Sequence, residues 1–260
     1  MQPDYLESAL LRAAGFRHAF FTRKGGASSG PYSSLNFSVS VGDELELVAE
    51  NFSRAGRVLG VPGDHIAVLS QVHGNVALVL DDTELARGPL WPRLAEREGD
   101  ALTSRAPGLA CAVRTADCVP ILVGERRSGA VSAIHAGWRG IVRGVLEAAL
   151  ASLREIAGEN PEFVAAIGPH IGPAAFETGE DVARELEASS PARDVVSMRG
   201  GRPHVALGPI VAAKLEAAGV SRTQIDDVSG CTATDPERFF SYRRDGKRSG
   251  RHLSAIVPQS

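Results

Sequence analysis

The sequence is poor in cysteine, and among its 260 residues only Cys111, Cys118 and Cys231 carry a thiol. An odd and sparse set does not build the disulfide framework of a small secreted protein and is more typical of a reducing compartment. The N-terminal segment has Asp4 and Glu7 where a secretory signal would have basic residues. We therefore expect a cytoplasmic protein.

Long apolar runs and an excess of positive charge are also missing. No segment approaches the roughly 18 uninterrupted apolar residues that a membrane helix needs, so no membrane span is expected. The 28 Lys and Arg residues stand against 31 Asp and Glu residues, which gives a net charge of −3. Proteins that bind nucleic acids normally carry a basic surplus, so we expect no nucleic-acid partner.

Strand-like and helix-like segments alternate along the chain, which predicts an α/β (α+β) fold. No repeat, low-complexity segment or linker divides the sequence, so we expect one domain over residues 1–260. The polar segment 81–99 is interpreted as a surface excursion. Strands are predicted at 18–22, 66–72, 76–80, 109–113, 119–123, 130–135, 163–167, 239–242 and 253–257, and helices at 5–13, 44–59, 138–157, 179–188 and 208–218.

Four residues with metal-binding or nucleophilic side chains, His73, Cys118, His135 and His170, lie at or beside the ends of predicted strands. In open α/β sheets the loops at the carboxyl ends of strands converge and form ligand sites. A catalytic zinc site takes three protein ligands and leaves one position open. Two imidazoles and one thiolate would supply such a set, although the spacing follows no local zinc motif.

Several blocks of the sequence, which run from residue 20 to residue 251, resemble the signature of the YfiH family. This family is also called the polyphenol-oxidase or laccase-domain family and is similar to the purine-nucleoside enzyme of mammalian macrophages. The three main blocks are Gln71-Val72-His73-Gly74, Thr115-Ala116-Asp117-Cys118-Val119-Pro120 and His135-Ala136-Gly137-Trp138-Arg139-Gly140. Further marks are Thr22 to Gly26, Ser34 to Asn36, Gly99 to Leu102, Ile167 to Pro169 and Phe239 to Asp245.

The resemblance implies a fold, a metal and an activity. The fold would be a single-domain sandwich of mixed β-sheets with peripheral helices, and Zn²⁺ would be held by His73, Cys118 and His135. The activity would be phosphorolysis of adenosine, inosine, guanosine and methylthioadenosine, together with deamination of adenosine. The partners would be a purine nucleoside and phosphate, and the protein would be a monomer or homodimer.

The laccase label implies copper and phenol oxidation instead, but the composition disfavours this chemistry. A blue-copper site uses an axial methionine, and the only methionines, Met1 and Met198, lie outside the signature blocks. Seven histidines in total are too few for the several copper sites of a multicopper oxidase. Thiolate and imidazole ligands suit zinc.

Deamination would use zinc-activated water at purine C6 and a proton carrier, for which Asp117 and His170 are the candidates. Asp117 has a competing role as the hydrogen-bond partner of a ligating histidine. For phosphorolysis, the anion would be bound by Arg23 with the backbone of Gly25 and Gly26, or by Arg139 at a helix N-terminus. Further candidate substrate contacts are Asn36 and Gln71, of which Gln71 shares a strand face with His73.

Two other functions remain open at this point. Cys118 and His135 could form a nucleophilic pair that hydrolyses amide bonds, as in an enzyme that edits peptidoglycan precursors, a role that is attached to bacterial members of the family. A non-catalytic zinc protein would need a fourth ligand, for which His170 is the candidate. The basic residues between Arg243 and Arg251 are interpreted as an exposed face of the molecule.

Overall fold

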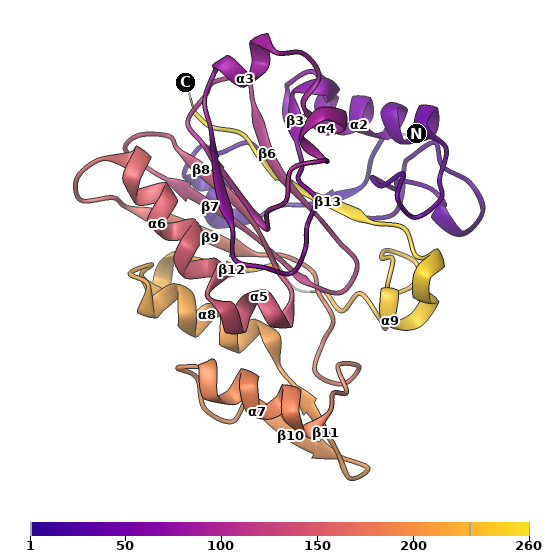
Figure 1. The fold of residues 1–260 in the computed structure, drawn as a ribbon, viewed down its shortest axis with the longest axis vertical. Helices are drawn as coiled ribbons and strands as arrows, with labels where there is room; N and C mark the ends of the chain where they lie inside the picture. The colour runs from indigo at the N-terminus through magenta and orange to yellow at the C-terminus, as the bar shows by residue number, and fades with distance from the viewer. Residues whose placement is uncertain (1, 229, 260) are drawn as a thin grey trace.

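Short runs of buried apolar residues form two β-sheets that lie face to face, as the computed structural model of residues 2–228 and 230–259 shows (Figure 1). The first sheet has six strands in the order β12-β9-β7-β8-β5-β4 and mixes parallel with antiparallel neighbours. Its strands are β4 (Ala77–Leu80), β5 (Ala101–Ser104), β7 (Val119–Glu125), β8 (Val131–Ala136), β9 (Phe163–Ile167) and β12 (Ile225–Asp227).

The second sheet has five strands in the order β1-β2-β13-β6-β3. Its middle strand, β13, comes from the end of the chain and is antiparallel to both β2 and β6. The strands are β1 (Tyr5–Leu6), β2 (His18–Phe21), β3 (Ile66–Ala67), β6 (Ala110–Thr115) and β13 (His252–Ile256). A separate hairpin pairs β10 (Val196–Arg199) with β11 (Arg202–Val205).

Helices cover the outer face of each sheet, so that the molecule has four layers. The core between the sheets contains Phe20, Leu122 and Ile256, all nearly inaccessible to solvent. Helix α2 (Leu45–Leu59) packs on the five-stranded sheet. The outer face of the six-stranded sheet is covered by α5 (Trp138–Arg143), α6 (Val145–Ala157) and α8 (Leu207–Ala217), whereas α7 (Glu180–Ser189) lies beyond them beside the hairpin, as Figure 1 shows.

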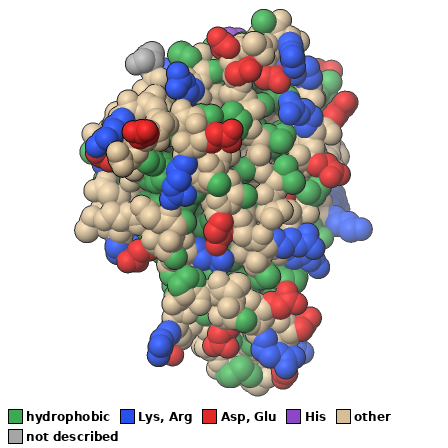
Figure 2. Space-filling view, turned by 60° about the vertical axis from the view of Figure 1, so that its left-hand side comes forward, with side chains coloured by type: hydrophobic (Ala, Val, Ile, Leu, Met, Phe, Trp, Pro, Cys, Tyr) green, Lys and Arg blue, Asp and Glu red, His purple; other side chains and the backbone are tan. Residues whose placement is uncertain are grey.

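Shorter helices lie in the connections between these elements. None of the helices in residues 2–228 and 230–259 is both long enough and apolar enough to cross a bilayer. Figure 2 shows one face of the molecule, on which acidic and basic side chains are interspersed, as the nearly balanced composition leads one to expect. The short helices are α1 (Ala9–Ala13), α3 (Thr83–Ala86), α4 (Leu90–Leu94) and α9 (Tyr242–Asp245), with 3-10 turns at Gly30–Tyr32, Gly63–His65, Arg222–Gln224 and Gly246–Arg248.

The predicted α/β sandwich of mixed sheets with peripheral helices is confirmed. The predicted helices 44–59, 179–188 and 208–218 correspond to α2, α7 and α8, and most predicted strands are present within a few residues of their expected bounds. The hairpin β10–β11 and the short strands β5 and β12 were not predicted.

Several expected elements are wrong in detail. The N-terminal helix is shorter, because Tyr5 and Leu6 pair with β2. The predicted helix 138–157 is divided at Gly144, which has a φ of 83° and ends α5 before α6 begins. The strand 66–72 ends at Ala67, and the strand 239–242 is absent because Tyr242 starts α9. The segment 81–99 is only partly a surface excursion, since it contains α3 and α4 and fully buries Leu90 and Leu94.

Candidate active site

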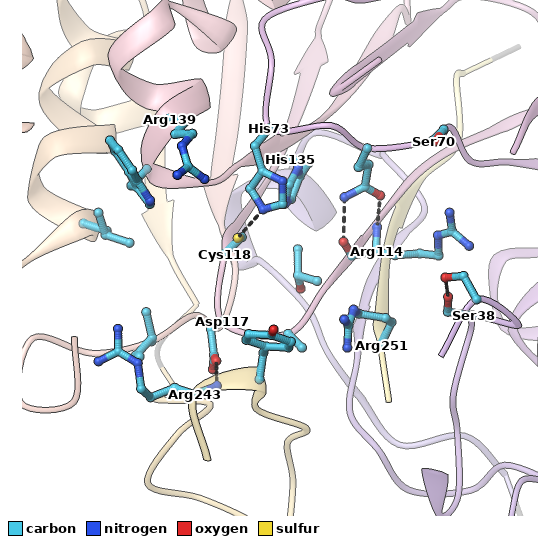
Figure 3. Close-up of a pocket in the computed structure, with 18 of the residues that line it drawn as sticks. Ser38, Ser70, His73, Arg114, Asp117, Cys118, His135, Arg139, Arg243 and Arg251 are labelled. Atoms are coloured by element: carbon cyan, nitrogen blue, oxygen red, sulfur yellow. Dashed lines mark hydrogen bonds between the residues drawn. The ribbon is translucent and has the colours of Figure 1, made fainter. Parts of the chain in front are cut away.

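His73, Cys118 and His135 form a cluster where three chain segments meet. His73 lies in the connection between β3 and β4, Cys118 in the turn between β6 and β7, and His135 in β8. The antiparallel pairing of β7 with β8 places Pro120 opposite His135, which brings the β6–β7 turn to that strand. Their ligand atoms all lie within 4.8 Å of one another, and Cys118 Sγ is 3.7 Å from His73 Nε2. The structure thus brings together the three predicted metal ligands (Figure 3).

The buried carboxylate of Asp100, only 1% exposed, organises this cluster. Its Oδ1 accepts hydrogen bonds from His135 Nδ1 at 2.7 Å and from the backbone N–H of His73 at 3.0 Å. Its Oδ2 accepts from the backbone N–H groups of Gly74 at 2.6 Å and Val72 at 3.3 Å. A carboxylate on Nδ1 of a histidine leaves Nε2 as the metal-binding atom and fixes the ring orientation.

Local backbone geometry also serves the cluster. His73 has a φ of 59°, in the left-handed region of backbone conformation. This conformation costs a non-glycine residue about 1–3 kcal/mol and persists only where surrounding contacts hold it. The hydrogen bonds from residues 72–74 to Asp100 hold this conformation. Gly137 lies so close to the ligands that a Cβ atom there would be 2.5 Å from His73 Cδ2 and 3.3 Å from Cys118 Sγ. Only glycine therefore allows the two ligands to approach each other at this point.

The electrostatics of the cluster favour a thiolate. Burial opposes ionisation of Cys118, but the neighbouring His135 and His73 lower the pKa of the thiol to about 6. Burial likewise disfavours protonated His135, but the Cys118 thiolate and Asp100 raise the pKa of its imidazole to about 9. A cation bound here would replace the imidazole proton and keep the thiolate charge compensated. A donor set of two imidazoles and one thiolate, with no fourth protein ligand in this group, fits a metal ion with an open coordination position.

The cluster opens into a cavity of about 780 Å³ with two chemically different ends. One end combines the rings of Trp138 and Phe176 with two arginines, Arg139 and Arg243, that lie over them. The other end, which we call the cationic end, contains Arg114, Arg251 and Ser38. In Figure 3 these three residues lie on one side of the metal-ligand cluster, while Arg139 and Arg243 lie on the other. The volume is that of a small-molecule site.

Among the predicted substrate contacts, Gln71 and Arg139 do line this cavity. The amide of Gln71 is already engaged, because it accepts from the backbone N–H of Arg114 and donates to its carbonyl, both at 2.7 Å. The guanidinium of Arg139 lies over the ring of Trp138, 4.7 Å from its centroid. The helix that carries Arg139 is the six-residue α5, shorter than expected because of Gly144.

Asp117, one of the two predicted proton carriers, also lines the cavity. Its φ is 95°, and its carboxylate accepts hydrogen bonds from Thr232 Oγ1 and from the backbone N–H of Arg243, both at 2.6 Å. Asp117 therefore joins the β6–β7 turn to the loop at Thr232 and to the start of α9. It does not contact His135, whose partner is Asp100.

His170, the other proposed proton carrier and possible fourth ligand, does not belong to the cluster. It is absent from the metal-ligand group and from the cavity lining. Its Nδ1 is 2.9 Å from the carbonyl of Gly168, and its ring packs close to Gly208 in α8. Burial lowers the pKa of this imidazole.

The structure also separates Arg23, Gly25, Gly26 and Asn36 from the cavity lining. Arg23 donates to the carbonyls of Ser33 and Pro236 and lies over the ring of Phe240. Gly25 and Gly26 lack space for a Cβ atom because other backbone segments, at residues 2–3 and 34–35, pass directly over them. The buried amide of Asn36 donates to Ser38 O and accepts from the backbone N–H groups of Ser38 and Arg251. These residues order the loops around the site instead of facing a ligand.

Sequence reasoning gave no role to Asp100, Arg114 or Arg251. Asp100 falls in a block that carried the family resemblance, and Arg114 immediately precedes Thr115, so the signature could have directed attention to both. Arg251 was assigned to an exposed basic face. Lys247 and Arg248 of that segment are exposed, but Arg251 is half-buried in the cavity wall because it immediately precedes β13.

Comparison with known proteins agrees with this fold and site. Residues 17–259 match the family model described as multi-copper polyphenol oxidoreductase laccase. A purine nucleoside phosphorylase of Deinococcus radiodurans is 39% identical over 251 residues, which are 95% of this chain and 92% of that protein. The purine nucleoside phosphorylase YfiH of Escherichia coli is 38% identical over 237 residues, 90% of each chain.

Solved structures show the same architecture. The crystal structure of YlmD from Geobacillus stearothermophilus superposes with a TM-score of 0.84 at 30% identity, over 94% of this chain and 92% of that one. YfiH from Bacillus licheniformis gives a TM-score of 0.85 at 27% identity, over 93% and 92% of the two chains. With residues of its three main signature blocks around one cavity and at least 90% of its length matched by each of these proteins, the chain belongs to the YfiH family, whose model carries the laccase description.

Proposed function

We propose that this protein is a zinc-dependent purine nucleoside phosphorylase that also deaminates adenosine. The observation that carries the proposal is the cluster of His73, Cys118 and His135, which opens into a cavity with aromatic rings at one end and the pair Arg114 and Arg251 at the other. The names of the relatives support an enzyme that acts on purine nucleosides. All 260 residues would form one catalytic domain, since the site draws on residues from Ser38 to Arg251.

The cavity suits a nucleoside in one orientation. Trp138 and Phe176 can cover the face of a purine and keep water from it. The base would then lie beside the metal-ligand cluster, with the sugar directed toward the cationic end. Because Asp117 lines the cavity and His170 does not, Asp117 is the proton carrier that we retain. Two lone-pair positions of its carboxylate are used by Thr232 and Arg243, and about two remain for a substrate proton.

Zinc is the metal that this donor set favours. When bound, it would act as a Lewis acid that lowers the pKa of water, which is the chemistry that deamination at C6 requires. Multicopper oxidation would need several metal sites, whereas residues 2–228 and 230–259 contain this one group of three or more His, Cys, Asp or Glu ligands. All three cysteines are free, which is consistent with the cytoplasm as the site of action.

The decisive experiment is incubation of the purified protein with adenosine and phosphate, with and without prior chelation. Adenine, inosine, hypoxanthine and ribose 1-phosphate are separated by chromatography. We expect phosphate-dependent adenine and phosphate-independent inosine, both lost on chelation and restored by zinc. His73→Ala should show neither product, whereas Arg248→Gln, on the exposed surface, is the matched control. A stoichiometric zinc protein that turns over no nucleoside would refute the proposal.

The geometry of Cys118 also favours a second candidate, a hydrolase of amide bonds in peptidoglycan precursors. The expected partner of the thiol was His135, whose ligand atom lies within 4.8 Å of Cys118 Sγ. His73 Nε2, at 3.7 Å, is within hydrogen-bond distance for sulfur, as in a thiol–imidazole nucleophile. Such an enzyme needs no metal. Its activity on a muramyl-peptide precursor would survive chelation and be abolished by alkylation of the thiol, the opposite of the pattern expected for the nucleoside enzyme.

A further inference from the structure

Two arginines at the cationic end of the cavity, Arg114 and Arg251, have no acidic partner. Nine other arginines form ion pairs with Asp or Glu, whereas neither of these two does so within residues 2–228 and 230–259. Their guanidinium groups donate only to backbone carbonyls. Arg114 donates to Leu69 O at 3.0 Å, and Arg251 to Ser249 O at 2.8 Å and Gly250 O at 3.1 Å.

The positive charge of Arg251 acts on Arg114. Burial, together with the charge of Arg251, lowers the pKa of Arg114 to about 10. Burial also lowers the pKa of Arg251. Cys118 and Asp117 act on Arg251 as nearby negative charges. No Asp or Glu of the described residues forms an ion pair with either arginine, so an anion from outside would stabilise the two half-buried like charges further. None of the guanidinium nitrogens of this pair is buried without a partner, so those not bonded to carbonyls reach the cavity.

The pair is also held in place by the surrounding structure. Arg114 lies on β6 opposite Leu253 of β13, and Arg251 comes immediately before that strand. Gln71 fixes the backbone of Arg114, and Asn36 accepts from the backbone N–H of Arg251. Two guanidinium forks fixed in this way match the oxygens of a tetrahedral anion.

We propose that Arg114 and Arg251 form the subsite that binds inorganic phosphate for phosphorolysis, an assignment that rests on the proposed nucleoside phosphorylase function. A phosphate oxygen forms the new bond to C1′ of the ribose as the C1′–N9 bond breaks. The electron pair of that bond stays on purine N9. The proton of the hydrogen phosphate dianion then passes to the purine, so the products are ribose 1-phosphate and the free base.

The arginines at the opposite end are less suited to this role. Arg139 lies over Trp138 and Arg243 lies over Phe176, with ring distances of 4.7 and 5.5 Å, and both are exposed to solvent. Figure 3 shows His73 and Cys118 between these two arginines and the pair Arg114 and Arg251. A nucleoside whose base lies on Trp138 therefore presents its C1′ toward Arg114 and Arg251, across the metal-ligand cluster.

The first test is direct binding of inorganic phosphate to the zinc-loaded protein by isothermal titration calorimetry. Loss of a hydrogen-bonded charge pair predicts that Arg251→Gln weakens phosphate binding roughly 10- to 100-fold. Arg251→Lys should recover part of the affinity, and Arg248→Gln, on the exposed part of the same segment, should bind as the wild type does. Arg114→Lys provides a second variant that keeps the charge at the more buried position and should also weaken binding.

Kinetics separate this subsite from the proposed function. In Arg251→Gln the KM for phosphate should rise by a larger factor than the KM for adenosine in deamination, which uses no phosphate, whereas Arg248→Gln should leave both unchanged. Wild-type phosphate affinity in both Arg251→Gln and Arg114→Lys would overturn the assignment. Phosphate binding that depends on Arg251 in a protein that turns over no nucleoside would refute the proposed function but leave an anion site. If adenosine 5′-phosphate, but not inorganic phosphate, binds in an Arg251-dependent way, the pair binds a nucleotide phosphate and the assignment is wrong.

Discussion

Asp100→Asn is the substitution that tests the organisation of the metal cluster most directly. The Asp100 carboxylate connects the side chain of one ligand, His135, to the backbone of another, His73, and also binds the N–H groups of Val72 and Gly74. Asparagine has nearly the same size and shape, but one of its two acceptor oxygens is replaced by an NH2 donor. The substitution therefore changes hydrogen bonding without creating a cavity.

The size of the effect follows from these contacts. In either orientation of the amide, two N–H donors face the new NH2 group. Because a buried donor without an acceptor costs about 1–3 kcal/mol, the free energy of unfolding of the metal-free protein should fall by about 2–4 kcal/mol. Loss of a carboxylate behind a ligating histidine typically weakens metal binding, and here we expect zinc affinity to drop by about 10- to 100-fold.

Zinc affinity can be measured by competition with a fluorescent chelator, and stability by urea unfolding of chelated protein. Asp235→Asn is the matched control, because Asp235 pairs with Arg238 outside the cavity. The control should retain wild-type zinc affinity. An Asp100→Asn variant that is less stable but binds zinc with unchanged affinity would show that Asp100 only braces the backbone, and the argument for its role at the metal would be refuted.

Three further predictions concern the rest of the chain. His170→Ala should retain zinc stoichiometry, measured by elemental analysis, whereas His73→Ala should lose it; the reverse result would contradict the placement of His170 outside the cluster. Burial opposes ionisation of Glu125, but hydrogen bonds from its neighbours outweigh this effect and lower the pKa of its carboxyl group. Ionised Glu125 therefore stabilises the folded protein at pH values above the pKa of about 4.3 that the group has in the unfolded chain, and this contribution is lost as the pH falls below that value. The free energy of unfolding, measured with urea between pH 3 and 6, should fall less steeply with decreasing pH in Glu125→Gln than in the wild type. An unchanged dependence on pH would contradict this prediction. Gly25→Ala and Gly88→Ala both place a side chain at positive φ, which costs about 1–2 kcal/mol, but only at Gly25 does backbone also occupy the space of the new Cβ atom. Gly25→Ala should therefore lower the midpoint of thermal unfolding more than Gly88→Ala does, and an equal decrease in both would refute the structural role of Gly25.

The sequence led to His73, Cys118 and His135 mainly through the family resemblance, since their spacing follows no local zinc motif. Cys118 and His135 lie beside or at the end of recognisable strands, whereas His73 lies in a connection, because the strand expected at 66–72 ends at Ala67. The pair Arg114 and Arg251 was harder to predict. Arg114 and Arg251 meet only because β13 pairs with β6, and nothing in the local pattern of either segment shows which strands become neighbours. The glycine-rich segment at Gly25 looked like an anion loop, but its glycines are required by chain crossings that only the three-dimensional structure shows.

Some missed features did have a local signal. Gly200 and Gly201 both have positive φ and form the two-residue turn between β10 and β11, and such a Gly-Gly pair between extended segments is typical of a hairpin. Gly144 within the predicted helix 138–157 was a possible interruption, since glycine is the residue that most easily leaves the helical conformation. The four-residue strand β5 has no comparable signal, because all four of its side chains are buried, including the polar Thr103 and Ser104, and no alternation of apolar and polar residues marks it.

The position of β13 in the five-stranded sheet has a consequence for synthesis on the ribosome. Strand β2 and strand β6 are separated in the sheet by residues 252–256, so neither can complete its hydrogen bonding while the chain is still short of this point. Arg251 reaches the cavity through the same strand. A nascent chain stalled before residue 252 should therefore be digested by protease within 18–21 and 110–115, and equal resistance before and after this point would contradict the idea. The cavity wall at Arg251 would thus be completed only after residues 252–256 have been translated and have paired with β2 and β6.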